Sequence, residues 1–415
     1  MLLLLTVGKN PLPVAVASAF LIHDIPSVTH VCLLHSGESQ EEAHRIRDFL
    51  VTRNLRPGIT VSCSPVENAA GGDSVFTVTS NLIAAFADVH CHYSGGTAYM
   101  AVESFRAILA QPRVRLHSSY LSASGNTLFE TSPNSSGRNR TLSNTLTLTV
   151  PEMIALHGYQ YCSTYDCRPI PQLTDILAPL AEEYEISSVP RIELNHRFDR
   201  VRAPIPFSVN LHTGDPILAT RLNELLREKI WAPTPASTWQ ATISTGHPHY
   251  ASLDHFFRGI GGIVELRVLS ALRRATVGTK GEIVFAKHIA RNANVTANTE
   301  LQTFEIDIVA VFGYQLVLIS CTTGKNDKTK LKAFEALHRA RQLGGGAARA
   351  IFVAPTEQPG FAATYEDSLH LDIGFRPSPA SPSPKPLEIW GPEKCAHLDA
   401  HLERYIAGLC PASPS

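Results

Sequence analysis

The stretch FEIDIVAVFGYQLVLISCTT, residues 304–323, decides the fold of the C-terminal part of the chain. Its two apolar runs, Glu305–Phe312 and Leu316–Ser320, flank a Gly-Tyr pair, which predicts two strands joined as a β-hairpin. Asp307 interrupts the first run. An unpaired carboxylate inside an apolar strand is costly, so we expect Asp307 to hold a cation.

Helices and strands are predicted on both sides of this hairpin. The segment Phe256–Arg274 is predicted to be helical and places Glu265 among apolar neighbours. Ile283–Ala290 is a predicted strand before the hairpin. After it come a helix over Lys328–Leu343 and a last core strand, Ala350–Ala354. Together these elements indicate a compact α/β domain.

The first 150 residues show strands alternating with helices. Leu2–Val7, Val28–His35 and Val89–Tyr93 are apolar enough to be strands of a buried sheet. Helices are predicted over Leu12–Leu21, Glu41–Asn54, Asn81–Ala87 and Tyr99–Leu109. The alternation predicts a parallel, Rossmann-like sheet, and ligands of such sheets bind beyond the carboxyl ends of the strands.

Three turns are expected to meet at that edge: 8–11, 36–39 and 94–97. The last reads SGGT and precedes a helix, whose free N–H groups suit a phosphate. A tight, N-capped turn without a ligand explains the same residues, so both interpretations stay open. The candidate ligand-binding residues are Gly8, Asn10, Pro11, Ser36, Ser94, Gly95, Gly96 and Thr97.

Residues 1–150 resemble CARF domains, the Rossmann-like sensors of cyclic oligoadenylates in CRISPR-associated effectors. The resemblance rests on VGKNPLP (7–13), YSGGTAYM (93–100) and VPEMIALHG (150–158). It implies a cyclic oligonucleotide or another nucleotide-like ligand, and a homodimer with the ligand on its twofold axis. The family often has a lysine after Gly-Gly-Thr, where this chain has Ala98.

Glu265, Asp307 and the hairpin resemble the PD-(D/E)xK nuclease core found in CARF-linked effectors. The resemblance covers residues 255–354 and implies Mg²⁺ or Mn²⁺, hard cations that prefer oxygen ligands. It also implies hydrolysis of a nucleic-acid phosphodiester. The second strand of that family ends in Glu-x-Lys, and this chain has Ser320 and Thr322 at the two positions.

Two interpretations of this departure remain open. In the first, the following helix supplies the missing groups from one face, where residues lie three or four positions apart. That face carries Lys328, Lys332, Glu335, Arg339 and Gln342. The candidate catalytic residues are then Glu265, Asp307, Glu335, Lys332 and Gln342, the first three being metal ligands. In the second interpretation the site is inactive and the stripe is an ordinary solvated helix face.

Positive charge that would favour a nucleic-acid partner is concentrated in one segment of the chain. The whole chain has a formal net charge of −1, but Thr322–Arg349 contains seven Lys or Arg residues and two acidic ones. Such a segment suits contact with a phosphate backbone, although an exposed basic helix has the same composition. The sequence therefore predicts a ligand-regulated, metal-dependent nuclease of DNA or RNA. The alternative is an inactive, nuclease-derived protein that binds nucleic acid or regulates.

Four regions are predicted along the chain. They are a CARF-like domain (1–150), a Pro-rich connector with short helices such as Ile217–Lys229 (151–245), the nuclease-like domain (246–376), and a Pro/Ser linker with a terminal helix over Glu393–Leu409 (377–415). The eight cysteines lack zinc-site spacing, and free thiols indicate a reducing compartment, the cytoplasm. Because no apolar run reaches the ~20 residues that span a bilayer, no membrane partner is expected.

Overall fold

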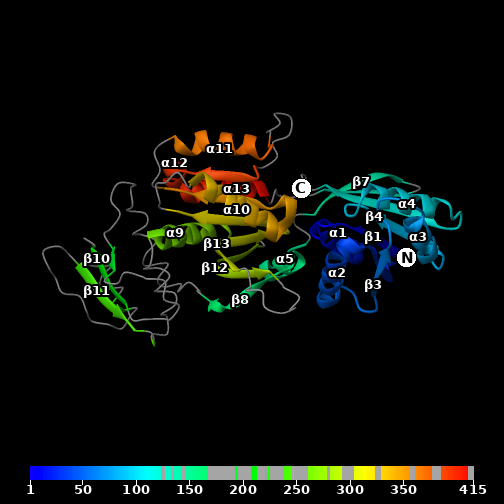
Figure 1. The fold of residues 1–415 in the computed structure, drawn as a ribbon, viewed down its shortest axis with the longest axis horizontal. Coiled ribbons are helices and arrows are strands. Elements are labelled where there is room, and N and C mark those ends of the chain that lie inside the picture. Colours follow the sequence, from blue (N-terminus) through cyan, green and yellow to red (C-terminus); the bar gives the residue numbers. More distant parts are fainter. Residues whose placement is uncertain are drawn as a thin grey trace.

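The computed structural model has two α/β lobes and a small separate sheet (Figure 1). It describes residues 1–122, 127–132, 135–142, 146–166, 192–194, 207–212, 238–244, 260–277, 281–291, 303–322, 329–355, 360–375 and 385–409, with positions 220, 223, 224 and 246. Most of the predicted helix Ile217–Lys229 and most of the predicted linker at 377–386 lie outside these residues.

A seven-stranded sheet forms the N-terminal lobe, with the strand order β3-β2-β1-β4-β5-β6-β7. The first five strands in this order are parallel and the last two pairings are antiparallel. The strands are β1 (Leu2–Val7), β2 (His30–Ser36), β3 (Thr60–Val66), β4 (Asp88–His92), β5 (Arg115–Ser122), β6 (Thr127–Ser132) and β7 (Ser135–Thr141). The predicted Rossmann-like parallel sheet is thus confirmed.

Helices cover both faces of this sheet because its strands are apolar on both sides. They are α1 (Leu12–Asp24), α2 (Gln40–Arg53), α3 (Ser74–Ile83) and α4 (Ala98–Leu109). Leu3 and Leu5 of β1 pack in the cluster of α1 and α2, whereas Leu2 and Leu4 pack in that of α3 and α4. This alternation follows from the period of two in a strand.

Two predictions in this lobe were wrong in detail. Strand β3 was not predicted, because it is a half-exposed edge strand that contains a proline and has little apolar character. The helix predicted over Asn81–Ala87 lies earlier, over α3. Its buried residues Val75, Thr79 and Ile83 are four apart, the spacing of one helix face.

The C-terminal lobe contains a six-stranded sheet in the order β16-β15-β14-β13-β12-β8. The strands are β8 (Tyr159–Asp166), β12 (Gly281–Arg291), β13 (Thr303–Phe312), β14 (Gln315–Cys321), β15 (Arg349–Val353) and β16 (Leu387–Trp390). The hairpin predicted from residues 304–323 is confirmed as the antiparallel pair β13–β14, with Val311 opposite Leu316. β8 joins the sheet from within the predicted connector, and the boundaries of the four regions stay a prediction.

The helices of this lobe are α9 (Ile260–Ala275), α10 (Thr329–Gly344), α11 (Phe361–Asp372), α12 (Pro392–Cys395) and α13 (Leu398–Leu409). The predicted terminal helix is therefore two helices, α12 and α13. α10 packs on the sheet face that carries Leu316 and Leu318. α9 packs on α13 and also contacts β13 and β14.

A third sheet, antiparallel and three-stranded, has the order β11-β10-β9. Its strands are β9 (Ile192–Leu194), β10 (Phe207–His212) and β11 (Thr238–Ile243). Figure 1 shows β10 and β11 at the end of the molecule away from the N-terminal lobe. Within the described residues, no helix combines the length and apolar character that crossing a bilayer requires.

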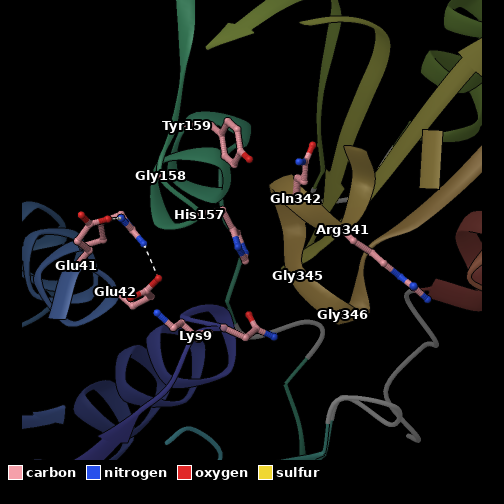
Figure 2. A pocket seen from close by; sticks show the side chains of 12 residues that line it. Lys9, Glu41, Glu42, His157, Gly158, Tyr159, Arg341, Gln342, Gly345 and Gly346 are labelled. Atoms are coloured by element: carbon pink, nitrogen blue, oxygen red, sulfur yellow. Dashed lines mark hydrogen bonds and ion pairs between the residues drawn. The ribbon is translucent and has the colours of Figure 1, made fainter. Parts of the chain in front are cut away.

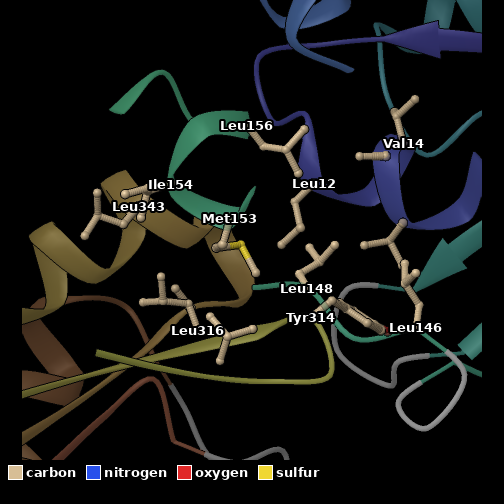
Figure 3. Packing of buried hydrophobic residues seen from close by; sticks show 14 of the residues in the cluster. Leu12, Val14, Leu146, Leu148, Met153, Ile154, Leu156, Tyr314, Leu316 and Leu343 are labelled. Carbon is tan, nitrogen blue, oxygen red and sulfur yellow. The ribbon is translucent and has the colours of Figure 1, made fainter. Parts of the chain in front are cut away.

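One continuous apolar cluster joins the two large lobes around α5 (Val150–Leu156) (Figure 3). Leu12 of α1 and Met153 of α5 belong to it together with Tyr314 and Leu343 of the C-terminal lobe. Arg53 of α2 also donates to the Glu152 carboxylate over 2.6 Å. Because the interior is close-packed, this cluster provides a continuous apolar connection between the two lobes.

Candidate functional site

Two acidic side chains of the predicted metal site, Glu265 on α9 and Asp307 on β13, lie close enough to repel each other. Glu265 is only 8% exposed. The backbone N–H of Cys321 donates to Oδ2 of Asp307 over 2.7 Å, and the Ser320 hydroxyl also bonds to this carboxylate. Strand β14 therefore orients Asp307 from the neighbouring position in the sheet.

Among the described residues, burial and neighbouring carboxylates dominate the electrostatics of Asp307, and no cation contributes to its pKa shift. The pKa of Asp307 is raised to about 7, first by burial and second by the negative charge of Glu265. The hydrogen bonds from Cys321 and Ser320 oppose this rise without cancelling it. A divalent cation beside the two carboxylates would remove both the repulsion and the desolvation cost, so these residues fit a hard metal ion.

Ser320 and Thr322, which stand where the family has Glu-x-Lys, make other interactions in this structure. Ser320 bonds to Asp307, and Thr322 is buried, with its backbone N–H donating to the Val353 carbonyl over 2.9 Å. Between them, the pKa of the Cys321 thiol is raised well above its usual value, first by burial and then by Asp307. Hard cations such as Mg²⁺ also prefer oxygen ligands to a thiol, so Cys321 is a poor substitute for the missing carboxylate.

Glu335 and Lys332 lie on the solvent-exposed face of α10. The Glu335 side chain is 59% exposed and pairs with Arg339 at 3.5 Å. In the part of the chain that the structure describes, no three His, Cys, Asp or Glu side chains gather as a metal site would require. The ligand role of Glu335 stays a prediction. Lys328 lies outside the described residues.

The structure separates Gln342 from Asp307. α10 crosses over between the parallel strands β14 and β15, so it runs opposite to them and its last turn lies at the start of β14. A Cβ on Gly344 would meet Leu316 at 2.6 Å. From Leu316 to Ser320 is about 14 Å at the rise of a strand. Sequence spacing predicts which helix face carries Gln342, but it gives no information on which end of β14 this residue lies beside.

The basic segment 322–349 is less available than its composition suggests. Arg349 is buried, at 8% exposed. Lys330 pairs with Asp372 at 2.8 Å, and the Arg339 guanidinium lies 4.2 Å from the centre of the Phe304 ring. Among the described residues, Lys332 and Arg341 remain as exposed cations of this segment, which weakens the prediction of a basic phosphate-contacting patch.

Two of the three predicted N-terminal turns touch. A Cβ on Gly8 would lie 2.7 Å from the Gly96 nitrogen, and one on Gly95 would lie 2.4 Å from the Thr6 carbonyl oxygen. Gly96 has φ +74, which favours glycine. The glycines therefore let the Gly-Gly-Thr turn pack closely on the end of β1.

The hydroxyls expected to face a ligand are already used. Ser94 Oγ accepts from the backbone N–H of Leu121 over 2.6 Å. Thr97 Oγ1 donates to the Ala69 carbonyl over 2.7 Å and caps α4. Ser36 forms a reciprocal cap with Ser39 at the start of the next turn. The ligand roles of these residues stay predictions, and the backbone N–H groups of the turns are the better candidates.

A cavity of about 400 Å³ lies between the N-terminal and C-terminal lobes, and we call it the interlobe cavity (Figure 2). Its lining comes from the turn after β1, the start of α2, the segment after α5 and the end of α10. The lining residues are Lys9, Asn10, Glu41, Glu42, Arg45, His157, Gly158, Tyr159, Arg341, Gln342, Gly345 and Gly346. Gly158, Gly345 and Gly346 belong to its walls, and only the docking of the two lobes reveals the cavity.

Comparison of the sequence with models of known families finds no match, and comparison with curated proteins finds none either. Solved structures do match. The protein VC1899 of Vibrio cholerae is similar with a TM-score of 0.68 at 14% identity, covering 98% of this chain and 98% of that one. Can2 of Sulfobacillus thermosulfidooxidans, solved with cyclic tetra-adenylate, has a TM-score of 0.61 at 15% identity, covering 98% and 99%.

A type III CRISPR defence DNA nuclease activated by cyclic oligoadenylate is also similar, with a TM-score of 0.50 at 17% identity. The match covers 87% of this chain and 47% of that nuclease. At such identities the likeness establishes the fold alone. The resemblance predicted from the sequence is confirmed at the level of the fold: the chain shares the two-lobed α/β architecture of these solved structures, with a Rossmann-like sheet in its first lobe.

Proposed function

We propose that this protein is a nucleotide-gated nuclease, in which a ligand of the N-terminal lobe controls metal-dependent phosphodiester hydrolysis by the C-terminal lobe. The proposal is carried by the buried pair Glu265 and Asp307, since burial and the charge of Glu265 both disfavour the ionised form of Asp307. The solved structures with this architecture support it, because two of them carry cyclic oligoadenylate in their descriptions.

The pair would divide the work as follows. Asp307, oriented by the Cys321 N–H and the Ser320 hydroxyl, would hold the cation together with Glu265. A bound Mg²⁺ or Mn²⁺ supplies Lewis-acid activation of water and stabilises charge on the phosphate. The lysine that normally offsets this charge has no counterpart at Thr322. Among the described residues, Lys332 on the adjacent helix α10 is exposed, and it would offset this charge in place of that lysine.

The N-terminal lobe would bind a cyclic oligonucleotide or another nucleotide-like anion at the turns around Gly8 and Gly96. The carboxyl ends of β1 and β4 bring these turns together, and helix N-termini favour anions there. We further propose a homodimer, nucleic acid as the substrate and a cytoplasmic location. The apolar cluster around α5 would pass the ligand's effect to the second lobe.

Calorimetric titration with Mn²⁺ tests the metal site without requiring any substrate. The wild type should bind, and Asp307→Asn and Glu265→Gln should each lose binding. Glu403→Gln, an exposed carboxylate on α13, serves as the matched control. Glu335→Gln separates the two interpretations of the family departure, since it weakens binding only if Glu335 is a ligand. An unchanged titration in Asp307→Asn would refute the metal site.

Cleavage is then measured on single- and double-stranded DNA and on RNA, with Mg²⁺ or Mn²⁺, with and without cyclic tetra-adenylate. We expect ligand-dependent cleavage that Asp307→Asn abolishes. Mn²⁺ binding without cleavage under any of these conditions would instead support the second candidate, a non-catalytic protein that binds nucleic acid. Ser320 and Thr322 at the Glu-x-Lys positions favour that candidate.

A further inference from the structure

The interlobe cavity contains a polar group that the fold leaves without a partner. His157, the first residue after α5, lines the cavity, and its Nε2 atom is buried with no hydrogen-bond partner among the described residues. Burial, with a smaller effect from Arg45, lowers the pKa of His157 to about 4, so the ring is neutral at pH 7. Buried polar atoms in folded proteins nearly always have a partner, which points to an occupant of the cavity.

The cavity wall is rich in hydrogen-bond donors. The side-chain oxygen of Gln342 accepts from Arg339 over 3.0 Å, so its amide N–H groups are left for an occupant. Lys9 adds an ammonium group that donates to the neutral backbone carbonyl of Glu38. In Figure 2, Gln342 and His157 lie on facing sides of the open space. Donors without acceptors suit a ligand with several acceptor oxygens.

The charge balance of the wall agrees with an anion. Its carboxylates, Glu41 and Glu42, pair with Arg45 at 3.4 Å and 3.1 Å. The three cations Lys9, Arg45 and Arg341 against these two acids leave a net lining charge of +1.

The volume and the aromatic lining of the interlobe cavity narrow the class of ligand that it can bind. A volume of about 400 Å³ falls within the range of roughly 300–1,000 Å³ for small-molecule pockets. Tyr159 is the aromatic residue of the lining, and its ring packs edge-on against Phe304 with centroids 5.9 Å apart. An aromatic face of this kind stacks on a base, while the donors suit a phosphate.

We propose that the interlobe cavity binds a nucleoside monophosphate, or one nucleotide unit of a larger ligand, and that Lys9, His157 and Gln342 contact it from both lobes. The inference rests on the proposed function in one respect, because Lys9 and Asn10 belong to the turn expected to receive a nucleotide. It adds the C-terminal lobe to the ligand site, through α10.

The position of α10 gives this contact a consequence. The helix has 16 residues, about 24 Å at the rise of an α-helix, and Gln342 lies in its last turn. Its first turn lies at the other end of β14, towards Asp307. A ligand held by Gln342 would therefore fix one end of the helix that flanks the acidic pair.

Calorimetry with adenosine 5′-monophosphate tests the site on the full chain, in EDTA and without nucleic acid. Inorganic phosphate and adenosine are titrated separately as the two halves of the probe. We expect the monophosphate to bind more tightly than either half. Gln342→Met and Lys9→Met should each weaken it about tenfold, because each removes a hydrogen bond to a charged group. The matched controls Gln111→Met and Arg404→Met, at exposed positions outside the cavity, should leave the affinity unchanged.

No binding of the monophosphate at millimolar concentration, or equal affinity in the wild type and both cavity variants, would overturn the proposal. Unchanged thermal midpoints of Gln342→Met and Lys9→Met exclude misfolding as a cause of lost binding. The Mn²⁺ titration of Asp307→Asn is independent of the cavity. If the monophosphate fails while Mn²⁺ still depends on Asp307, this inference alone falls, and the reverse outcome removes the nuclease proposal alone.

Discussion

Replacing Asp307 with asparagine should stabilise the protein above neutral pH and abolish its affinity for a divalent cation. Asparagine keeps an oxygen that accepts the hydrogen bond from the Cys321 N–H but removes the charge. The pKa of Asp307 rises from 3.8 to about 7 in the folded chain, through burial first and Glu265 second. At about 1.4 kcal/mol per pH unit, ionised Asp307 costs at most about 4 kcal/mol of folding free energy.

The sign of the pH effect follows from where the proton is held. Between pH 4 and pH 7 the folded state keeps a proton on Asp307 that the unfolded chain has released. The stability associated with this group is therefore fully present below its unfolded pKa, and it is lost as the pH rises through about 7. Asparagine does not titrate. The advantage of Asp307→Asn should grow by up to about 3 kcal/mol between pH 5 and pH 8.

Urea unfolding of both proteins in EDTA, at pH 5 and pH 8, measures this difference. Tryptophan fluorescence reports on the C-terminal lobe through the buried Trp390. At pH 8, Mn²⁺ at 100 times its dissociation constant should restore about 2.7 kcal/mol to the wild type and nothing to Asp307→Asn. An advantage of equal size at the two pH values would refute the reasoning, since Asp307 would then not be a buried carboxylate beside Glu265.

Two further predictions concern the contact between the lobes and the Asp307 environment. Gly345 has φ +69, and a Cβ there would lie 2.7 Å from Asn10 Oδ1, whereas Gly374 has the same φ with nothing within 4 Å. In thermal melts, Gly345→Ala should therefore lose more stability than the roughly 1 kcal/mol of backbone strain expected for Gly374→Ala. Adding Asn10→Ala to Gly345→Ala should recover the excess loss. A double variant no more stable than Gly345→Ala would contradict the contact. Ser320→Ala removes a hydrogen bond that lowers the pKa of Asp307. The pH midpoint of Mn²⁺ binding, measured by calorimetry, should therefore move upward. A downward move would contradict the proposed site.

Much of the fold could be predicted from local sequence. The hairpin β13–β14 was predictable, and is confirmed, because two long apolar runs around a Gly-Tyr turn have few alternative structures. The parallel sheet is confirmed because buried strands of continuous apolar character alternate with helices. Strand β3 was missed, since an edge strand buries one face at most and its TVSCSPV sequence carries a weak pattern.

The candidate site was predictable in part. A single charged residue in an apolar strand is visible in sequence, and it led to Asp307 and to Glu265 on the preceding helix. The partners of that carboxylate were not visible. Helical spacing placed Glu335 and Gln342 on one face of α10 but gave no information on which end of the helix, or which side of it, would meet the acidic pair.

What the sequence by itself determined are the features that depend on near neighbours in the chain: strand periodicity, the helix faces, the turn residues and the isolated carboxylate. Tertiary structure alone decided which distant groups share a space. It places Glu265 beside Asp307 and Gln342 at the far end of β14. It also places Lys9 and His157 in the lining of one cavity. The physical reason is that burial and electrostatic repulsion act through space, and the packing of two lobes sets distances that residue spacing along a chain does not encode.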